Sequence, residues 1–248
     1  MFTKVYNISD DKEVTLTAYI PDISEEMQNM KVKPAVLILP GGAYKFCSDR
    51  EAEPIALAYL AKGFNAFILR YSLNEKAAFP TPLDDAKNAL SFIRNNAGIF
   101  FTDPQKIAVI GFSAGGHLAA ALSSMSEEKP NACILGYPCI LDSTSPILAK
   151  PVESVDKYVT RQTPPSFIFA ASNDGCVPII NSLKYAEALD KNNVSFEMHI
   201  FSEGDHGFSL GTDVVCSSEE GQKICRANSY WLDRSAEWLK KLFFNREY

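Results

Sequence analysis

The sequence predicts an α/β fold in which a mostly parallel central sheet is covered by helices on both faces. Two observations support this prediction. Short apolar runs alternate along the chain with longer segments of helical periodicity, and such repeated strand–helix units build parallel sheets through right-handed crossovers. The apolar runs are rich in Val, Ile, Leu and Phe without regular polar alternation, which is typical of strands that are buried on both faces.

Local patterns define the elements of the first half of the chain. Residues 13–20 alternate between apolar and polar side chains and predict an edge strand. Residues 34–39 are continuously apolar and predict a buried strand that ends at Pro40-Gly41-Gly42. The other elements are a helix at 52–62 ending at Gly63, a buried strand at 64–71, a helix at 82–97 ending at Gly98 with Leu83, Ala86, Leu90 and Ile93 on its apolar face, a strand at 106–111, and a helix from 114.

The second half of the chain continues the same alternation. Apolar runs predict strands at 132–137, 166–172 and 195–201, and helical periodicity predicts helices at 178–191 and 228–243. The last helix carries an apolar stripe that we expect to pack on the core, formed by Trp231, Trp238, Leu239, Leu242 and Phe243.

Two irregular segments, 138–165 and 202–227, are long for a compact domain, and loops of this length are often functional. We expect residues 138–165 to form a small cap. Because no linker or repeat interrupts the chain, residues 1–248 are expected to form a single domain.

Composition and charge limit the classes of partner. The net charge is −6, and nucleic acids and anionic membranes both attract basic surfaces, so we expect neither as a main partner. No stretch is typical of a signal peptide or a transmembrane helix. The six cysteines are scattered without a Cys-x-x-Cys pair, which favours reduced thiols in a cytoplasmic protein. The sequence leaves open whether Cys216 and Cys225 pair, whether a longer precursor is secreted, and whether the protein forms a homo-oligomer.

The most informative motif is Gly111-Phe112-Ser113-Ala114-Gly115, between the predicted strand at 106–111 and the helix from 114. A sharp strand-to-helix turn holds such a serine in a strained backbone geometry, and glycines on either side let neighbouring chain pass closely. The hydroxyl then stands free above the sheet, so Ser113 is the predicted nucleophile. The alternative, a glycine-rich turn without chemistry, is disfavoured by the flanking strand and helix.

A serine hydroxyl needs a base to take its proton, and histidine usually serves because its pKa lies near neutral pH. Among the three histidines, His206 follows the strand at 195–201 and should lie at the carboxyl edge of the sheet, where Ser113 also emerges. His206 is therefore the predicted base. We expect His117 to pack or hydrogen-bond on the helix after Ser113, and His199 to be a structural residue within a strand.

The predicted partner of His206 is Asp174, which directly follows the strand at 166–172. A carboxylate there can accept a hydrogen bond from the second imidazole nitrogen and fix the tautomer of the ring. Asp205 is the first rival, although a residue adjacent to His206 is expected to point away from it. Asp142 is a more distant rival.

Backbone N–H groups that stabilise a developing negative oxygen form an oxyanion hole. Ala114 supplies one such group at the start of the helix. The turn after the strand at 34–39 supplies the others, for which Gly42 and Ala43 are predicted. The alternative for this turn is an ordinary glycine turn.

Together these segments resemble the α/β-hydrolase superfamily, in its esterase/lipase branch, over about residues 33–245. The chain order of Ser113, Asp174 and His206 is the order of that superfamily. The segment Leu39-Pro40-Gly41-Gly42-Ala43-Tyr44 is similar to the glycine-rich oxyanion loop, except that Pro40 and Ala43 stand where hormone-sensitive-lipase-like esterases carry His and Gly. With Ser48-Asp49-Arg50-Glu51-Ala52-Glu53-Pro54, the loop resembles small bacterial proteins related to acetyl-xylan esterases and feruloyl-esterase-like hydrolases, some of them xylanase-associated.

The resemblance implies the α/β-hydrolase fold with a small cap and an esterase activity. We expect a serine carboxylic-ester hydrolase that acts on short acyl esters, with acetylated sugars such as xylo-oligosaccharides as the implied substrate. Tyr44, Asp49 and Arg50, near the oxyanion turn, are candidates for contacting the sugar; packing and ion-pair roles are the alternative. No metal or cofactor is expected, because the histidines lack ligand spacing and no P-loop lysine is present.

Two other functions remain as alternatives. One is a peptidase or acyl-peptide hydrolase that uses the same three side chains on amides, although 248 residues leave no room for the β-propeller that such enzymes usually carry. The other is a catalytically silent hydrolase fold that binds a ligand or a protein.

Overall fold

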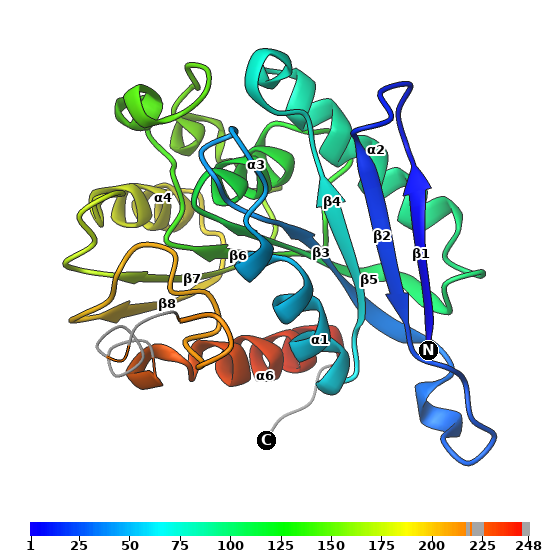
Figure 1. Cartoon of the computed structure of the whole chain (residues 1–248). Helices are drawn as coiled ribbons and strands as arrows, with labels where there is room; N and C mark the ends of the chain where they lie inside the picture. Colours follow the sequence, from blue (N-terminus) through cyan, green and yellow to red (C-terminus); the bar gives the residue numbers. More distant parts are fainter. Residues whose placement is uncertain (217–218, 220–225, 245–248) are drawn as a thin grey trace.

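The computed structural model describes residues 1–216, 219 and 226–244. Within these residues a single eight-stranded sheet has the order β1-β2-β4-β3-β5-β6-β7-β8 (Figure 1). The strands are β1 (Phe2–Asn7), β2 (Thr15–Ile20), β3 (Lys33–Leu39), β4 (Asn65–Arg70), β5 (Thr102–Phe112), β6 (Ala132–Gly136), β7 (Ser166–Ala171) and β8 (Phe196–Phe201). Strands β3 to β8 pair in parallel, whereas β2 pairs antiparallel with both β1 and β4. The prediction of a mostly parallel sheet is confirmed.

Helices cover both faces of the sheet, as predicted (Figure 1). They are α1 (Glu53–Ala61), α2 (Thr81–Asn95), α3 (Ser113–Ser124), α4 (Ile180–Lys191) and α6 (Trp231–Phe244). Successive side chains of a strand point to opposite faces, so Leu37 of β3 joins the apolar cluster under α2, α3 and α4, whereas Val36 and Ile38 join the cluster under α1 and α6.

The predicted apolar faces of two helices are confirmed. Leu83, Ala86, Leu90 and Ile93 of α2 are all buried. In α6, Trp231 and Leu239 are fully buried, and the partly buried residues Trp238, Leu242 and Phe243 pack against the same cluster.

The prediction of an edge strand at 13–20 is wrong in its position. β2 lies inside the sheet, where Thr17 pairs with Val5 of β1 on one side and with Ile68 of β4 on the other. The edge on this side of the sheet is β1, which the sequence analysis did not identify, and β8 forms the opposite edge. The side chains of β1 are exposed except that of half-buried Tyr6, which packs against aromatic rings of the core. β1 therefore carries no apolar pattern, and backbone pairing with β2 defines it.

The parallel strands end together at one edge of the sheet. The register aligns Leu39 with Gly111, Phe112 with Gly136, and Ala171 with Phe201. Consequently the segments that follow β3, β5, β7 and β8 emerge side by side, where functional groups of α/β sheets gather.

The predicted cap segment, residues 138–165, follows β6 and carries two short 3-10 helices, η4 (Asp142–Ile147) and η5 (Val155–Tyr158). Its start is fixed to α4, because Asn181 accepts hydrogen bonds from the N–H groups of Ile140 and Leu141 at 2.9 Å each. Among the described residues, no helix combines the length and the apolar character needed to cross a membrane.

Candidate active site

Ser113 is the first residue of α3 and directly follows β5, at the turn that the sequence predicts. Its φ is +52°, a left-handed conformation that costs a non-glycine residue about 1–3 kcal/mol. The flanking glycines allow neighbouring backbone to pass close to this turn. A Cβ at Gly111 would lie 2.0 Å from the carbonyl oxygen of Gly115, and a Cβ at Gly115 would lie 2.1 Å from that of Leu39. The backbone therefore passes too closely for any side chain at these two positions.

The structure brings together the three predicted catalytic side chains. The hydroxyl of Ser113 lies 2.8 Å from Nε2 of His206, and Nδ1 of His206 lies 2.7 Å from Oδ2 of Asp174. With the Nδ1 proton donated to the carboxylate, Nε2 is left as an acceptor for the serine proton. This geometry is what removal of a proton from Ser113 requires.

Asp174 is held as an ionised carboxylate. Burial raises the pKa of Asp174, but the hydrogen bonds from His206 and from the N–H groups of Val177 and Cys176 outweigh burial and bring this pKa below 3.8. The two N–H groups donate to Oδ1 at 2.9 and 2.8 Å, so the other oxygen is free to orient the imidazole.

The other candidate bases lie outside this arrangement, as predicted. His117 is buried between the Tyr44 hydroxyl and the carbonyl oxygen of Glu153, both at 3.0 Å. Burial lowers the pKa of His117 from 6.5 to about 4, so the ring is neutral near pH 7. His199 is bonded to Glu197 at 2.8 Å and stacks on Phe167.

The rival acids also lie elsewhere. Asp205 is exposed, and Asp142 forms an ion pair with Lys157 at 3.5 Å. Among the carboxylates that the sequence analysis weighed, the hydrogen bond to His206 belongs to Asp174.

The predicted oxyanion turn lines the same cavity as Ser113. Gly42 has φ of +122° and Ala43 of +57°, and the carbonyl oxygen of Gly42 accepts the N–H groups of Lys45 and Phe46 at 2.9 and 3.2 Å. No described residue accepts a hydrogen bond from the N–H of Gly42 or Ala43. Both residues line the cavity beside Ser113 and His206.

Ala114 directly follows Ser113 in the first turn of α3. The N–H groups of a first helical turn have no partner within the helix. The third predicted donor is therefore placed where a helix N-terminus favours negative charge.

The cavity at this site has a volume of about 240 Å³. Its walls include Phe46, Arg50, Cys176 and, from η4 of the predicted cap, Ile147. Arg50 thus lies where a substrate group would be, and its contact with substrate stays a prediction.

The other two predicted contact residues lie outside this cavity. Tyr44 is 1% exposed and its hydroxyl is bonded to His117, so the packing alternative holds for Tyr44. Asp49 lines a neighbouring pocket and forms an ion pair with Arg70 at 2.8 Å.

Sequence reasoning missed Glu51, a buried carboxylate in the wall of the cavity. Its Oε2 accepts the N–H of Gly41 at 2.8 Å, and its Oε1 accepts the hydroxyl of Tyr137 at 2.6 Å. The Tyr137 hydroxyl in turn accepts the N–H of Ser209 at 3.1 Å. Burial raises the pKa of Glu51, and the two hydrogen bonds that it accepts oppose this rise.

Glu51 therefore joins the turn that carries Gly42 and Ala43 to the segment that follows His206. The indole N–H of Trp231 in α6 donates to the carbonyl oxygen of Ser209 at 2.8 Å and fixes this segment from behind. The partners of Glu51 lie 10 and 86 residues away in the chain, so no local motif indicates its role.

Two further observations concern the cysteines. The sulfur of Cys139 lies 3.9 Å from the Ser113 oxygen, and burial raises the pKa of Cys139 to about 12, so it remains a neutral thiol near pH 7. Cys225 lies outside the described residues, so the structure does not test whether it pairs with Cys216.

Comparisons with known proteins agree with this geometry. The family model BD-FAE matches residues 21–142, and the Prolyl oligopeptidase family model matches residues 147–243. The crystal structure of MGS-M1, described as an alpha/beta hydrolase enzyme from a Medee basin deep-sea metagenome library, is 47% identical, has a TM-score of 0.90 and covers 98% of both chains. The chain belongs to the α/β-hydrolase family. The fold class and the family predicted from the sequence are both confirmed.

Other relatives of this α/β hydrolase carry more specific names. The acetyl ester-xyloside bifunctional hydrolase of Caldicellulosiruptor lactoaceticus is 28% identical, with a TM-score of 0.82 over 97% of both chains. Endo-1,4-beta-xylanase B of Butyrivibrio fibrisolvens is 31% identical over 87% of this chain and 39% of its own length. The acetylxylan esterase of Xylanibacter ruminicola is 28% identical over 83% of this chain and 46% of its own length. The chain thus spans less than half of these two curated relatives.

Proposed function

We propose that this α/β hydrolase is a serine carboxylic-ester hydrolase that removes short acyl groups, acetyl in particular, from sugar hydroxyls. One observation carries the proposal. The Ser113 hydroxyl is bonded to His206, and His206 to Asp174, and Gly42 and Ala43, the predicted oxyanion residues, line the same cavity as Ser113 and His206. A nucleophile, a base and an oxyanion site together are the machinery of acyl transfer.

The reaction follows from this arrangement. Nε2 of His206 takes the hydroxyl proton as the oxygen of Ser113 attacks the ester carbonyl, and the N–H groups of Gly42, Ala43 and Ala114 bind the resulting oxyanion. When the tetrahedral intermediate breaks down, His206 gives the proton to the leaving alcohol and the acyl group stays on Ser113. Water then attacks the acyl-enzyme with His206 again as base, which releases the carboxylic acid and restores the serine.

The size of the cavity supports a short acyl group. Its volume of about 240 Å³ is below the ~300–1,000 Å³ of typical small-molecule sites. Phe46 and Ile147 are part of its walls, so the acyl side offers little room for a long chain. The names of the xylan-related relatives support a sugar as the alcohol.

The decisive experiment compares the hydrolysis of p-nitrophenyl acetate by the wild-type protein and by Ser113→Ala. We expect a loss of roughly three or more decades in kcat/KM. Ser123→Ala, a buried serine near the far end of the same helix, is the matched control and should retain the wild-type rate. Equal rates for wild type and Ser113→Ala would refute the proposal.

A peptidase activity is the second candidate, because the Prolyl oligopeptidase family model matches residues 147–243. An aminoacyl p-nitroanilide assayed beside p-nitrophenyl acetate separates the two. The esterase proposal expects the ester to be preferred, and a preference for the anilide would favour the peptidase. A silent binding protein would instead leave Ser113 unlabelled by a fluorophosphonate probe.

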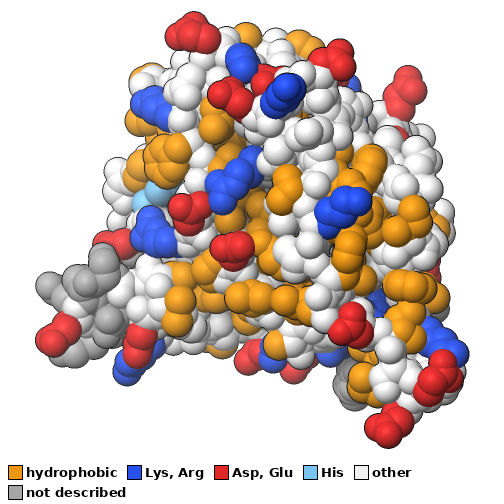
Figure 2. Space-filling model, turned by 45° about the vertical axis from the view of Figure 1, so that its right-hand side comes forward, with side chains coloured by type: hydrophobic (Ala, Val, Ile, Leu, Met, Phe, Trp, Pro, Cys, Tyr) orange, Lys and Arg blue, Asp and Glu red, His pale blue; other side chains and the backbone are white. Residues whose placement is uncertain are grey.

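We also propose that the protein works in the cytoplasm on a small-molecule ester, without nucleic acid or membrane as partner. The unpaired thiols of Cys47, Cys133, Cys139 and Cys176 are suited to a reducing compartment. Figure 2 shows basic and acidic side chains interspersed on the visible face, without a broad basic patch, which agrees with the net charge of −6. Recovery of the protein from the culture medium or an envelope fraction of its own cells would refute this location.

A further inference from the structure

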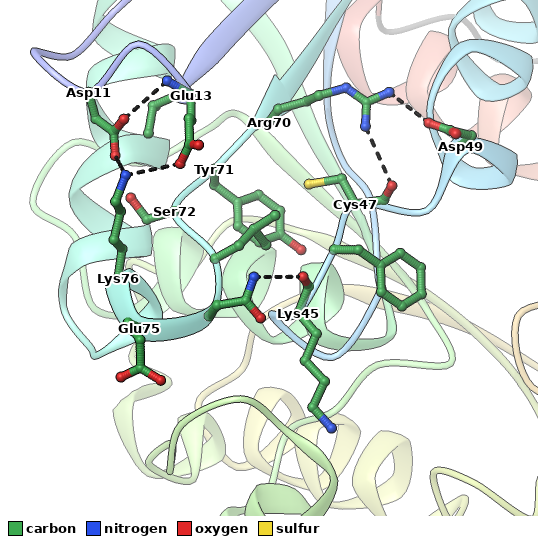
Figure 3. A pocket seen from close by; sticks show the side chains of 14 residues that line it. Asp11, Glu13, Lys45, Cys47, Asp49, Arg70, Tyr71, Ser72, Glu75 and Lys76 are labelled. Carbon is green, nitrogen blue, oxygen red and sulfur yellow. Dashed lines mark hydrogen bonds and ion pairs between the residues drawn. The ribbon is translucent and has the colours of Figure 1, made fainter.

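A second pocket, larger than the reactive cavity, lies beside the oxyanion turn and takes no part in the mechanism above. Its volume is about 710 Å³, well inside the range of small-molecule binding sites. Its walls come from the segments after β3 and β4 and from the turn before β2, and they include Asp11, Lys45, Arg70, Ser72 and Lys76 (Figure 3).

This pocket adjoins the reactive cavity through a shared wall. Phe46 lines both spaces, and the residue is 58% exposed. The backbone of Phe46 packs closely on the oxyanion turn, because its N–H is bonded to the carbonyl oxygen of Gly42 at 3.2 Å and a Cβ at Gly42 would lie 2.1 Å from the Phe46 carbonyl oxygen. An exposed aromatic ring between two pockets suits the apolar face of a sugar ring.

The charges of the pocket nearly cancel. Its walls carry the carboxylates of Asp11, Glu13, Asp49 and Glu75 and the cations of Lys45, Arg70 and Lys76, and Glu75 is paired with Lys150 at 2.7 Å. Lys76 lies between Asp11 and Glu13, with its ammonium 2.7 and 2.9 Å from their carboxylates. On the opposite side, Arg70 binds Asp49 at 2.8 Å, and Figure 3 shows Ser72 and Tyr71 between the two groups. An anionic ligand would meet the carboxylates, and a cationic ligand would meet Arg70 and Lys76.

Such a lining suits a neutral ligand with many hydroxyl groups. A hydroxyl both donates and accepts hydrogen bonds, so it can use the carboxylate oxygens and the N–H groups of the same ion pairs. The reactive cavity, at about 240 Å³, is too small to bury the acyl group together with a chain of several sugar rings. The alcohol part of a large substrate must therefore extend beyond this cavity.

We propose that the pocket between Lys76 and Arg70 is a subsite for the neutral main chain of an acetylated oligosaccharide, which passes over Phe46 to place its ester at Ser113. This inference rests on the proposed esterase function and adds to it where the sugar chain binds. It predicts that additional sugar rings improve the substrate, and that uncharged rings are required.

The test measures kcat/KM for acetylated xylotetraose and for acetylated xylose, and compares their ratio among variants. We expect the wild-type ratio to be at least about tenfold in favour of the longer substrate. Phe46→Ala and Lys76→Met should each lower this ratio about five- to tenfold. Lys87→Met is the matched control, because Lys87 is also paired with a carboxylate but lies on α2 outside both pockets, and it should keep the wild-type ratio.

Direct binding separates failure of the subsite from failure of the esterase. Calorimetry on Ser113→Ala should show binding of unacetylated xylotetraose, its weakening by Lys76→Met, and no binding of tetragalacturonate, which has the same number of rings with a carboxylate on each. A protein that hydrolyses no ester but binds xylotetraose in this way would refute the esterase and support the subsite. Equal ratios in all variants, or binding that Phe46→Ala and Lys76→Met leave unchanged, would overturn the subsite.

Discussion

Replacing Glu51 with glutamine tests whether this buried carboxylate holds the oxyanion turn in its reactive shape. Glutamine has nearly the same size, but only its carbonyl oxygen can accept hydrogen bonds. If its amide group faces Gly41, two N–H donors oppose each other at a contact that is now 2.8 Å. If it faces Tyr137, the phenol oxygen can accept a hydrogen bond from the amide beside the one that it accepts from Ser209, but the phenol proton loses the carboxylate oxygen that now accepts it. Either orientation leaves one buried donor without a partner.

The expected size of the effect follows from this count. One buried donor without an acceptor costs about 1–3 kcal/mol. Because Glu51 is only 3% exposed, water cannot replace the lost acceptor. The turn can relieve this cost by moving, and a displacement of about 1 Å at a reactive centre costs about 100-fold in rate. For Glu51→Gln we expect kcat on p-nitrophenyl acetate to fall about 10- to 100-fold, KM to change by less than about threefold, and the free energy of unfolding in urea to fall by about 1–3 kcal/mol.

A matched control lies two residues further along the chain. Glu53 also accepts a tyrosine hydroxyl, that of Tyr19 at 2.5 Å, but it lies outside the cavity. Glu53→Gln should therefore leave kcat unchanged. If Glu51→Gln lowers the free energy of unfolding and yet keeps kcat within twofold of the wild type, Glu51 contributes only to stability and the reasoning is refuted.

Three further predictions concern the same site. Asp174→Asn removes the carboxylate that fixes the imidazole tautomer, so kcat on p-nitrophenyl acetate should fall roughly 10³- to 10⁴-fold, and an unchanged kcat would contradict the assigned role. Gly115→Ala forces a Cβ to within 2.1 Å of the Leu39 carbonyl oxygen and should lower the free energy of unfolding by about 3 kcal/mol or more, whereas Gly98→Ala, with nothing within 4 Å, should cost less than about 1 kcal/mol. His117 has a folded-state pKa of about 4 against 6.5 for the unfolded chain, so the unfolded state binds the proton more tightly and stability falls as the pH drops from 6.5 to 4. At roughly 1.4 kcal/mol per pH unit this loss is about 3 kcal/mol. The free energies of unfolding of wild type and His117→Gln, measured in urea at pH 7.5 and pH 4, test it. Their difference should be about 3 kcal/mol smaller at pH 4, and an equal difference at both pH values would contradict the assignment.

The sequence was sufficient for those parts of the site that follow strand ends. Ser113 and Asp174 come shortly after the buried strands β5 and β7, and His206 follows the half-exposed last strand β8. Parallel strands bring such positions to one edge of the sheet. The structure joins them through hydrogen bonds of 2.8 and 2.7 Å. The glycines at 111 and 115 are a further signal in the sequence, because a tight strand-to-helix turn leaves no room for side chains there.

Other parts of the protein left no local signal. The side chains of β1 are nearly all exposed, and the pairing that makes it a strand is a property of its backbone and of β2. Glu51 lies in a polar stretch that is typical of a solvated helix start, and only the distant Gly41 and Tyr137 make it a buried acceptor. Tyr44 is close to the oxyanion turn in sequence, but the bond to His117 draws its side chain into the core.

The hydrogen bond from Trp231 to the carbonyl oxygen of Ser209 has a consequence for biosynthesis. A nascent chain on the ribosome already contains Ser113, Asp174 and His206 before α6 has been made, but the loop after His206 then lacks the anchor behind it. Turnover should therefore begin only once the last helix has been synthesised and docked. A truncated chain that ends before Trp231 would keep Ser113, Asp174 and His206 and yet hydrolyse no ester. Ester hydrolysis is therefore a sensitive reporter of completed folding.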